Sequence, residues 1–279
     1  CQFVDKYALR QLPIDAVKPW GWDLALRSYL LRYGVECVPT EEEISLIRDL
    51  SHRRCAIELL SALMPMASDV LQMPVVCTTQ ESVDEMLAKF HRVVIKAPWS
   101  SSGRGVRFVE GKISTYHEGW IRHVIERQGS VIVEPYYHKV KDFGMEFYSD
   151  GMGHVRYLGL SLFHTRNGAY TGNIIATEDE KMGMLSRYVS DSFLLDIREN
   201  IQNGFGRLYG SRYRGPFGVD MMIISTPRQD GFLLHPCVEI NLRRTMGHVA
   251  LSIPPFADGF PRVMQIALTD KYGLRIRKP

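Results

Sequence analysis

The sequence predicts a mixed α+β (α/β) fold, because antiparallel strand pairs alternate with helices along the chain. Two pairs of apolar segments are each joined by turn residues: 145–151 with 154–165 across DGMG, and 216–224 with 232–243 across STPRQDG. Between these pairs, residues 178–208 have mainly helical character. This order of elements argues against a TIM barrel or a doubly wound parallel sheet.

Local patterns predict the other elements. Thr40, with Glu43 three residues later, forms a capping-box pattern, so we expect a helix over 39–50. The apolar strand 130–137 stops pairing at Pro135, which has no backbone N–H. The remaining expected elements are helices over 51–64, 81–90, 117–128 and 260–273, and strands over 73–79, 92–99 and 106–110.

Composition excludes several classes of protein. The 279 residues are 45% hydrophobic and 23% charged, with a net charge of +3 and no long basic run, so a nucleic-acid-binding face is not indicated. Five cysteines without CxxC spacing argue against a disulfide framework or a structural zinc site. No apolar run approaches the ~18–20 residues that cross a bilayer, and no signal peptide is visible, so we expect a cytoplasmic protein without a membrane partner.

The stretch VIKAPWSSSGRGV (94–106) is a candidate anion site. Lys96 lies in an apolar strand, where its charge is costly unless an anion meets it. The Ser/Gly loop that follows offers backbone N–H groups and hydroxyls that can surround phosphate oxygens. Neither the P-loop pattern GxxxxGK[ST] nor a strand-to-helix GxGxxG is present. The alternative is a flexible hairpin, 92–99 with 106–110, whose lysine extends to solvent.

The stretches GVDMMI and VEINLRR form a candidate cation site. Asp220 interrupts an apolar strand, and Glu239 and Asn241 leave the same face of the next strand. Such oxygens suit Mg²⁺. Arg243 and Arg244 follow directly and can neutralise a phosphoryl group or bind a carboxylate. The alternatives are an alternating exposed face, which Glu239 and Asn241 fit well, and a solvated strand end for the arginines.

Two further glutamates have positions that suit a nucleotide. Glu134 ends the apolar strand before Pro135, and Glu146 opens the next strand. In chain order, these features are an apolar strand that contains Lys96 (the lysine strand), the Ser/Gly loop, and a strand that ends in Glu-Pro. A strand that contains Glu146, a strand that contains Asp220 and the sequence Glu-x-Asn then follow. Over about residues 50–250, this succession resembles the ATP-grasp superfamily, although the loop SSSGRG is poorer in glycine than is usual there.

The resemblance implies a role for each motif. Lys96 and a basic residue on the preceding helix, Arg53 or Arg54, would contact ATP phosphates; Arg54 is the one we assign. The loop would close over these phosphates, Glu146 would hold the ribose, and Arg243 or Arg244 would face an acyl-phosphate intermediate. The loop residues are Ser100, Ser101, Ser102 and Gly103; the adenine pocket would be lined by Glu134, Tyr136 and Tyr137; and Mg²⁺ would be held by Asp220, Glu239 and Asn241.

The resemblance also implies a domain plan. Residues 1–50 would form a short N-terminal segment with a truncated start, 51–133 a central subdomain with the phosphate-loop lid, and 134–279 a C-terminal subdomain with the Mg²⁺-binding strands. PWGWD (19–23) is unassigned. NGAYTGN (167–173) either lines the acceptor site or is a Gly/Asn loop. The nine histidines have no metal-ligand spacing and are expected to be structural.

The implied activity is that of an ADP-forming carboxylate–amine ligase. ATP, with one or two Mg²⁺ (or Mn²⁺) ions, would activate a small carboxylate as an acyl phosphate, which an amine or less often a thiol attacks. The substrates would be of amino-acid or peptide type. Two alternatives stay open: phosphate transfer to a small molecule without ligation, and a non-catalytic nucleotide-binding module.

Overall fold

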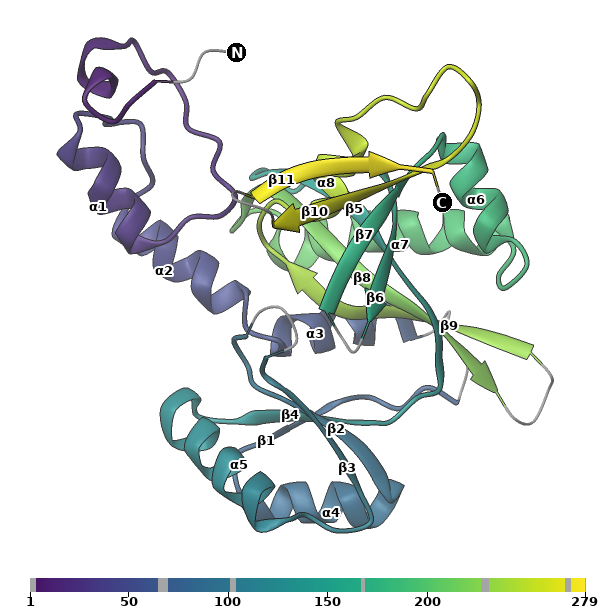
Figure 1. The fold of residues 1–279 in the computed structure, drawn as a ribbon. Helices are drawn as coiled ribbons and strands as arrows, with labels where there is room; N and C mark the ends of the chain where they lie inside the picture. Colours follow the sequence, from purple (N-terminus) through teal and green to yellow (C-terminus); the bar gives the residue numbers. More distant parts are fainter. Residues whose placement is uncertain are drawn as a thin grey trace.

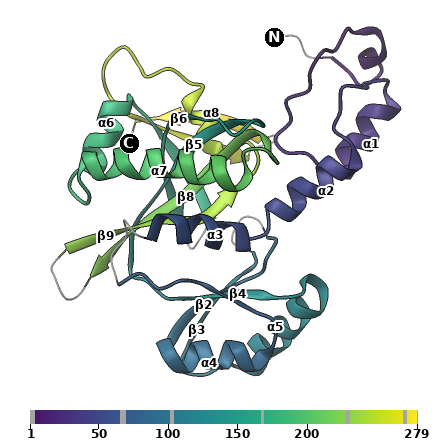
Figure 2. The ribbon, with the colours of Figure 1, turned by 180° about the vertical axis from the view of Figure 1, so that it is seen from behind.

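In the computed structural model (Figures 1 and 2), two antiparallel sheets lie on either side of helix α3, and an N-terminal arm extends from them. The structure describes residues 4–64, 70–100, 104–166, 169–226, 231–268 and 272–278. In these ranges the helices are η1 (Ala8–Gln11, 3-10), α1 (Leu24–Arg32), α2 (Glu41–Leu50), α3 (Arg54–Leu63), α4 (Gln80–Phe90), α5 (Thr115–Gln128), α6 (Glu178–Leu185), α7 (Asp191–Tyr209) and α8 (Met246–Leu251). The strands are β1 (Val75–Cys77), β2 (Arg92–Lys96), β3 (Val106–Glu110), β4 (Val131–Pro135), β5 (Lys139–Asp150), β6 (Val155–Arg166), β7 (Ala169–Ile175), β8 (Arg214–Thr226), β9 (Gly231–Asn241), β10 (Arg262–Leu268) and β11 (Tyr272–Arg277).

The smaller sheet has the strand order β1-β4-β2-β3, and all of its pairs are antiparallel. Val93 and Ile95 of β2 and Val133 of β4 pack in one cluster with residues of α4 and α5. Because side chains alternate along a strand, Lys96 and Glu134 leave the opposite face, which looks toward α3 and the larger sheet.

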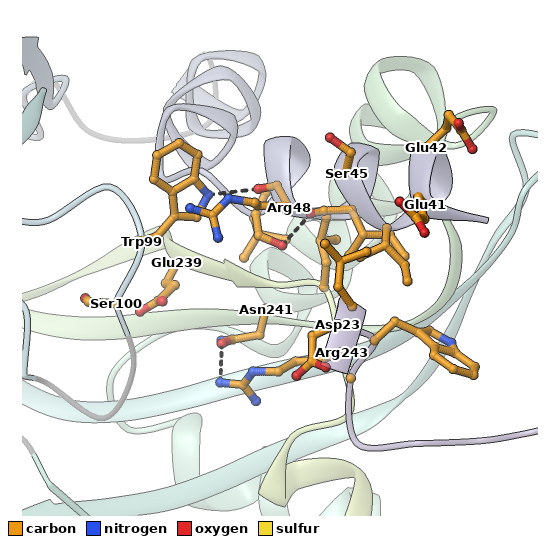
Figure 3. Close-up of a pocket in the computed structure, with 18 residues that line it drawn as sticks. Asp23, Glu41, Glu42, Ser45, Arg48, Trp99, Ser100, Glu239, Asn241 and Arg243 are labelled. Atoms are coloured by element: carbon orange, nitrogen blue, oxygen red, sulfur yellow. Dashed lines mark hydrogen bonds between the residues drawn. The ribbon is translucent and has the colours of Figure 1, made fainter. Parts of the chain in front are cut away.

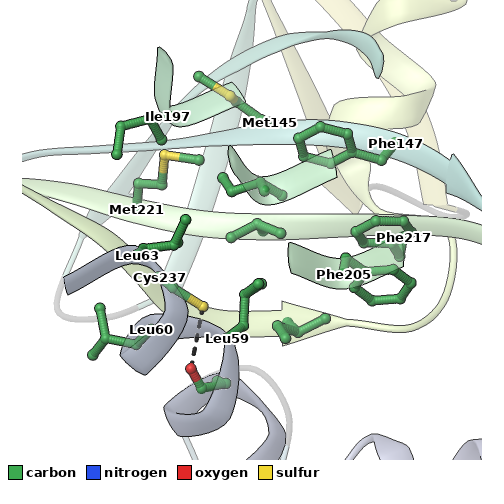
Figure 4. Packing of buried hydrophobic residues seen from close by; sticks show 14 of the residues in the cluster. Leu59, Leu60, Leu63, Met145, Phe147, Ile197, Phe205, Phe217, Met221 and Cys237 are labelled. Carbon is green, nitrogen blue, oxygen red and sulfur yellow. Dashed lines mark hydrogen bonds between the residues drawn. The ribbon is translucent and has the colours of Figure 1, made fainter. Parts of the chain in front are cut away.

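The larger sheet has the order β11-β10-β7-β6-β5-β8-β9. One face is covered by α3 and α7, whose apolar residues pack with those of β5 and β8 (Figure 4). Phe205 of α7 stacks on Phe217 of β8 with ring centroids 3.8 Å apart, and Phe217 stacks on Phe147 of β5 at 5.2 Å. Phe147, Val219 and Met221 pack in the core on this face, so their sequence neighbours Glu146 and Asp220 leave the other face.

The N-terminal arm, residues 4–50, contains α1 and α2. Thr40 and Glu43 form the capping box that the sequence predicts at the start of α2. Asp23 caps α1 by accepting a hydrogen bond from the Leu26 backbone N–H. No helix in the described ranges is long and apolar enough to span a bilayer.

Most predicted elements are confirmed, but the C-terminal helix over 260–273 is wrong. Residues 262–268 and 272–277 form β10 and β11, which pair with each other, and β10 also pairs with β7. The sequence of β10 has no long-range pairing information, and a short apolar run fits either period. NGAYTGN is strand β7 from Ala169 onward, whereas residues 167–168 lie outside the described ranges.

Candidate nucleotide and metal site

The three predicted metal ligands lie together on the open face of the larger sheet, the face opposite α3 and α7. Asp220 of β8 is directly opposite Glu239 of β9 in the strand register, and Asn241 is two residues further along β9. The amide nitrogen of Asn241 donates to Asp220 Oδ2 at 3.0 Å. Sequence spacing predicts the Glu239–Asn241 pair, whereas the placement of Asp220 beside them results from the antiparallel pairing of β8 and β9.

The Asp220 carboxyl is held in an unfavourable environment for negative charge. Burial raises its pKa to about 8, and the nearby carboxylates of Glu239 and Glu146 add to the shift. A divalent cation would relieve this repulsion. The donor set therefore fits a hard cation: two carboxylates and an amide oxygen, with room left for phosphate oxygens. No group of three His, Cys, Asp or Glu side chains in the described ranges is arranged to hold a metal by itself.

Lys96 and Glu134 form a buried ion pair on the face of the smaller sheet that looks toward α3. Their side chains are only 9% and 7% exposed, respectively. The cavity beside this pair, lined also by Pro74, Ile132 and Val238, measures about 10 Å³ and is too small for a nucleobase. The space beside Lys96 and Glu134 would therefore hold a nucleotide only if the two sheets separated.

Arg53, rather than the assigned Arg54, lies at the site. Its guanidinium donates to Ala97 O at 2.6 Å and Ser100 Oγ at 2.9 Å, and it pairs with Glu239 at 3.0 Å. Arg53 therefore connects the end of β2, which carries Lys96, with β9, which carries Glu239. Arg54 is exposed, because the first turn of α3 turns it away from the sheets. Spacing along a helix start cannot choose between adjacent residues, which point about 100° apart.

Glu146 lies on the floor of the open face, in a tightly enclosed position. Thr245 donates to Glu146 Oε1 at 2.7 Å, and His248 Nδ1 lies 2.9 Å from Oε2. Side chains at Gly218 and Gly247 would collide with this carboxylate, so glycine is needed at both positions. Oε2 is buried and has no hydrogen bond to a described residue, although His248 pairs with it when the imidazole is protonated.

The other predicted site residues are more dispersed. Tyr136 lies under the guanidinium of Arg92, 3.7 Å from the ring centroid, and the Tyr137 hydroxyl accepts from the Gln72 N–H. Arg243 donates to Asn241 Oδ1 at 2.9 Å, whereas Arg244 is absent from the lining of both large cavities. The predicted loop residues Ser101, Ser102 and Gly103 lie outside the described ranges.

Two large cavities adjoin the cluster. The sheet cavity, about 610 Å³, lies over the open face and is lined by Trp20, Glu146, Ser161, Phe163, Thr165, Tyr170, Asn173, Asp220, Glu239, Asn241, Arg243, Thr245, Met246 and Gly247. The arm cavity, about 770 Å³, lies against α2 and is lined by Gly21, Trp22, Asp23, Leu24, Glu41, Glu42, Ile44, Ser45, Ile47, Arg48, Ser51, Trp99, Ser100, Glu239, Ile240, Asn241, Leu242 and Arg243 (Figure 3).

The sequence interpretation missed several residues at the site. Thr245 and His248 form a capping box at α8, with histidine where glutamate is usual, and this pattern was the available signal. His235 is buried beside Tyr137, and its Nδ1 atom has no hydrogen bond to a described residue. Burial lowers the pKa of His235 to about 4. A single histidine in an apolar strand carries no spacing that reveals this position.

Three solved structures with a similar fold are enzymes bound to ADP or to an ATP analogue. The biotin carboxylase–β,γ-ATP complex from Campylobacter jejuni matches with a TM-score of 0.54 and 13% identity, covering 86% of this chain and 56% of that one. The N5-carboxyaminoimidazole synthetase from Staphylococcus aureus, complexed with ADP, matches with a TM-score of 0.51 and 14% identity, covering 78% and 57%. The biotin carboxylase domain of Hydrogenobacter thermophilus 2-oxoglutarate carboxylase, with MgADP and bicarbonate, gives 0.53 and 12%, covering 86% and 55%.

These matches show that the chain has the ATP-grasp fold, as the order of motifs predicts. The chain spans little more than half the length of these three neighbours. No protein-family model and no curated protein matches the sequence.

Proposed function

We propose that this protein is an ATP-dependent ligase that activates a carboxylate as an acyl phosphate for attack by an amine. One observation carries the proposal: Arg53 links the lysine strand of the smaller sheet to Glu239 of the larger sheet. Side chains that could bind phosphates and side chains that could bind a metal are thus connected directly where the two sheets face each other. The ATP-grasp fold and the nucleotide-bound neighbours support the same conclusion.

Asp220, Glu239 and the amide oxygen of Asn241 would hold Mg²⁺, which supplies charge neutralisation for the β- and γ-phosphates. In the structure, Arg53 forms an ion pair with Glu239, and Asn241 donates a hydrogen bond to Asp220. Lys96 would exchange Glu134 for a phosphate once the two sheets separate. Glu134 and the chain through Tyr137 would then face the adenine, and Glu146 Oε2 the ribose.

The reaction balances in two steps. A carboxylate oxygen of the acid attacks the γ-phosphorus, the bond from that phosphorus to the β–γ bridging oxygen breaks, and ADP leaves. The free amine then attacks the acyl carbon, the carbon–oxygen bond to phosphate breaks, and inorganic phosphate leaves. The nitrogen, which arrives as an ammonium ion, loses one proton to solvent before the attack and another to the departing phosphate or solvent after it. Arg243 is held by Asn241 at the border of both cavities, where it can neutralise the acyl phosphate.

The test is calorimetric titration with MgADP and with the non-hydrolysable analogue MgAMPPNP. We expect binding that requires Mg²⁺ and that falls at least tenfold in Asp220→Asn and Glu239→Gln. Asp196→Asn on the exposed side of α7 is the matched control and should bind normally. Undetectable binding by the wild-type chain would contradict the proposal.

A second measurement distinguishes ligation from phosphate transfer. A screen of amino acids and small peptides should find pairs of acid and amine that stimulate ADP release together. ADP release that needs no amine and leaves a stable phosphorylated product would contradict ligation.

A further inference from the structure

Residues 97–100, which follow β2 directly, are hydrogen-bonded to Arg53 at three points. The Arg53 guanidinium donates to Ala97 O at 2.6 Å and to Ser100 Oγ at 2.9 Å. The Arg53 backbone N–H donates to Pro98 O at 3.2 Å. The direction in which Arg53 presents its charge therefore depends on where residues 97–100 lie.

Trp99, within this segment, is fixed by contacts with two helices and the turn between α2 and α3. Its indole N–H donates to Arg48 O in α2 at 2.8 Å (Figure 3), and the Arg48 guanidinium lies 4.9 Å from the centre of the ring. The His52 ring meets the indole in an edge-to-face arrangement, with 4.7 Å between the ring centroids. The Trp99 backbone N–H donates to Gln128 Oε1 in α5 at 3.0 Å. Trp99 thus anchors the segment that holds Arg53.

The Arg53 side chain depends on these partners because it is buried. It is only 8% exposed, and its Nε atom has no hydrogen bond to a described residue. Besides the acceptors at Ala97 and Ser100, the guanidinium donates to the candidate metal ligand Glu239 at 3.0 Å. A buried charge is costly unless it is paired and hydrogen-bonded. A displacement of Ser100 would therefore remove one of few partners and let the guanidinium turn.

Trp99 itself lies outside the candidate phosphate and metal site. It is absent from the lining of the sheet cavity and from the lining of the small cavity beside Lys96 and Glu134. It lines the arm cavity instead, as Ser100 does. An influence of Trp99 on a bound phosphate would therefore be transmitted through its neighbour Ser100 and through Arg53.

We propose that Trp99 is a positioning residue for phosphate binding. By holding Ser100 against the Arg53 guanidinium, it sets the direction in which Arg53 presents its charge to the β- and γ-phosphates of ATP. Arg48 contributes by holding the indole ring from the side of α2. This inference rests on the proposed ligase function, and it adds the residue on which the phosphate contact of Arg53 depends.

The test compares two nucleotides on the full chain, well below its melting temperature. Calorimetric titration measures the affinity for MgAMPPNP, and displacement of MgAMPPNP measures the affinity for AMP, which lacks the β- and γ-phosphates. Trp99→Leu should weaken MgAMPPNP binding about tenfold, as expected for one hydrogen bond to a charged group. The AMP affinity should change less than about twofold. Trp99→Phe should recover part of the loss, because a ring stays beside Arg48 and His52.

Two further sets of variants isolate the anchor of the indole. Arg48→Met removes the cation above the ring and should weaken MgAMPPNP binding about two- to fivefold, whereas Arg48→Lys keeps a cation and should restore most of it. Trp120→Leu is the matched control. Trp120 is also half-buried, with the Arg107 guanidinium 4.7 Å from its ring, but it packs on the other face of the smaller sheet. Its loss should lower the melting temperature and leave both nucleotide affinities unchanged.

Three results would overturn the inference and leave the ligase proposal intact: normal MgAMPPNP binding by Trp99→Leu, an equal loss for AMP and MgAMPPNP, or an equal loss in Trp120→Leu. A purely structural role of Trp99 would give one of these results, because it would lower the melting temperature without selecting among phosphates. Undetectable MgAMPPNP binding by the wild-type chain would instead contradict the ligase proposal, and this inference with it.

Discussion

The buried ion pair between Lys96 and Glu134 gives a direct test of the site in the nucleotide-free protein. Replacing Lys96 by Met leaves the Glu134 carboxylate without its partner on a face where it is only 7% exposed. Removal of one member of a buried pair costs about 3–5 kcal/mol of unfolding free energy. For a chain of this size, each kcal/mol lowers the melting temperature by about 2–4 °C, so we expect Lys96→Met to melt roughly 6–20 °C lower.

The double variant Lys96→Met/Glu134→Leu should recover most of this loss, since neither charge then stays buried. Lys139→Met is the matched control, because Lys139 pairs with Asp142 on the surface and its side chain is 41% exposed. It should cost no more than about 1 kcal/mol. Circular dichroism during heating, without nucleotide, measures all four proteins. A Lys96→Met shift no larger than that of Lys139→Met, or a double variant as unstable as the single one, would refute a buried pair.

Three further predictions concern the surroundings of the site. Burial holds the pKa of His235 near 4, below its value of about 6.5 in the unfolded chain. The free energy of unfolding should therefore fall by up to about 3 kcal/mol as the pH drops from about 6.5 to about 4. In urea unfolding, His235→Gln should not show this pH-dependent loss. Gly247→Ala should be destabilising and should abolish ADP release, because the added methyl group overlaps Glu146 and Ser161, whereas Gly183→Ala on open surface should be harmless. Trp20→Ala should lower kcat about two- to fivefold through Arg243 while leaving the MgAMPPNP affinity unchanged; Trp20→Phe should restore part of the loss.

Local sequence patterns predicted most helices and strands because their signals lie within a few residues. The capping box at Thr40 and the hairpin of β2 and β3 are examples, and both are present in the structure. The sequence predicts a helix where β10 lies, because the strand that joins β10 to the larger sheet, β7, is about 90 residues earlier in the chain. Secondary structure that depends on such a partner has no local signature.

For the candidate site, the sequence determined the residue types and their alternation. Alternation along a strand predicts that Lys96 leaves the opposite face from its apolar neighbour Ile95, and that Glu239 and Asn241 leave the same face of their strand. Both arrangements are present in the structure. Only the tertiary structure decided which side chains meet: Arg53 instead of Arg54 reaches Glu239, and PWGWD lies between two cavities. The physical reason is that alternation and helical period depend on covalent geometry along the chain. Contacts between segments depend instead on how whole sheets and helices pack, which no short stretch of residues specifies.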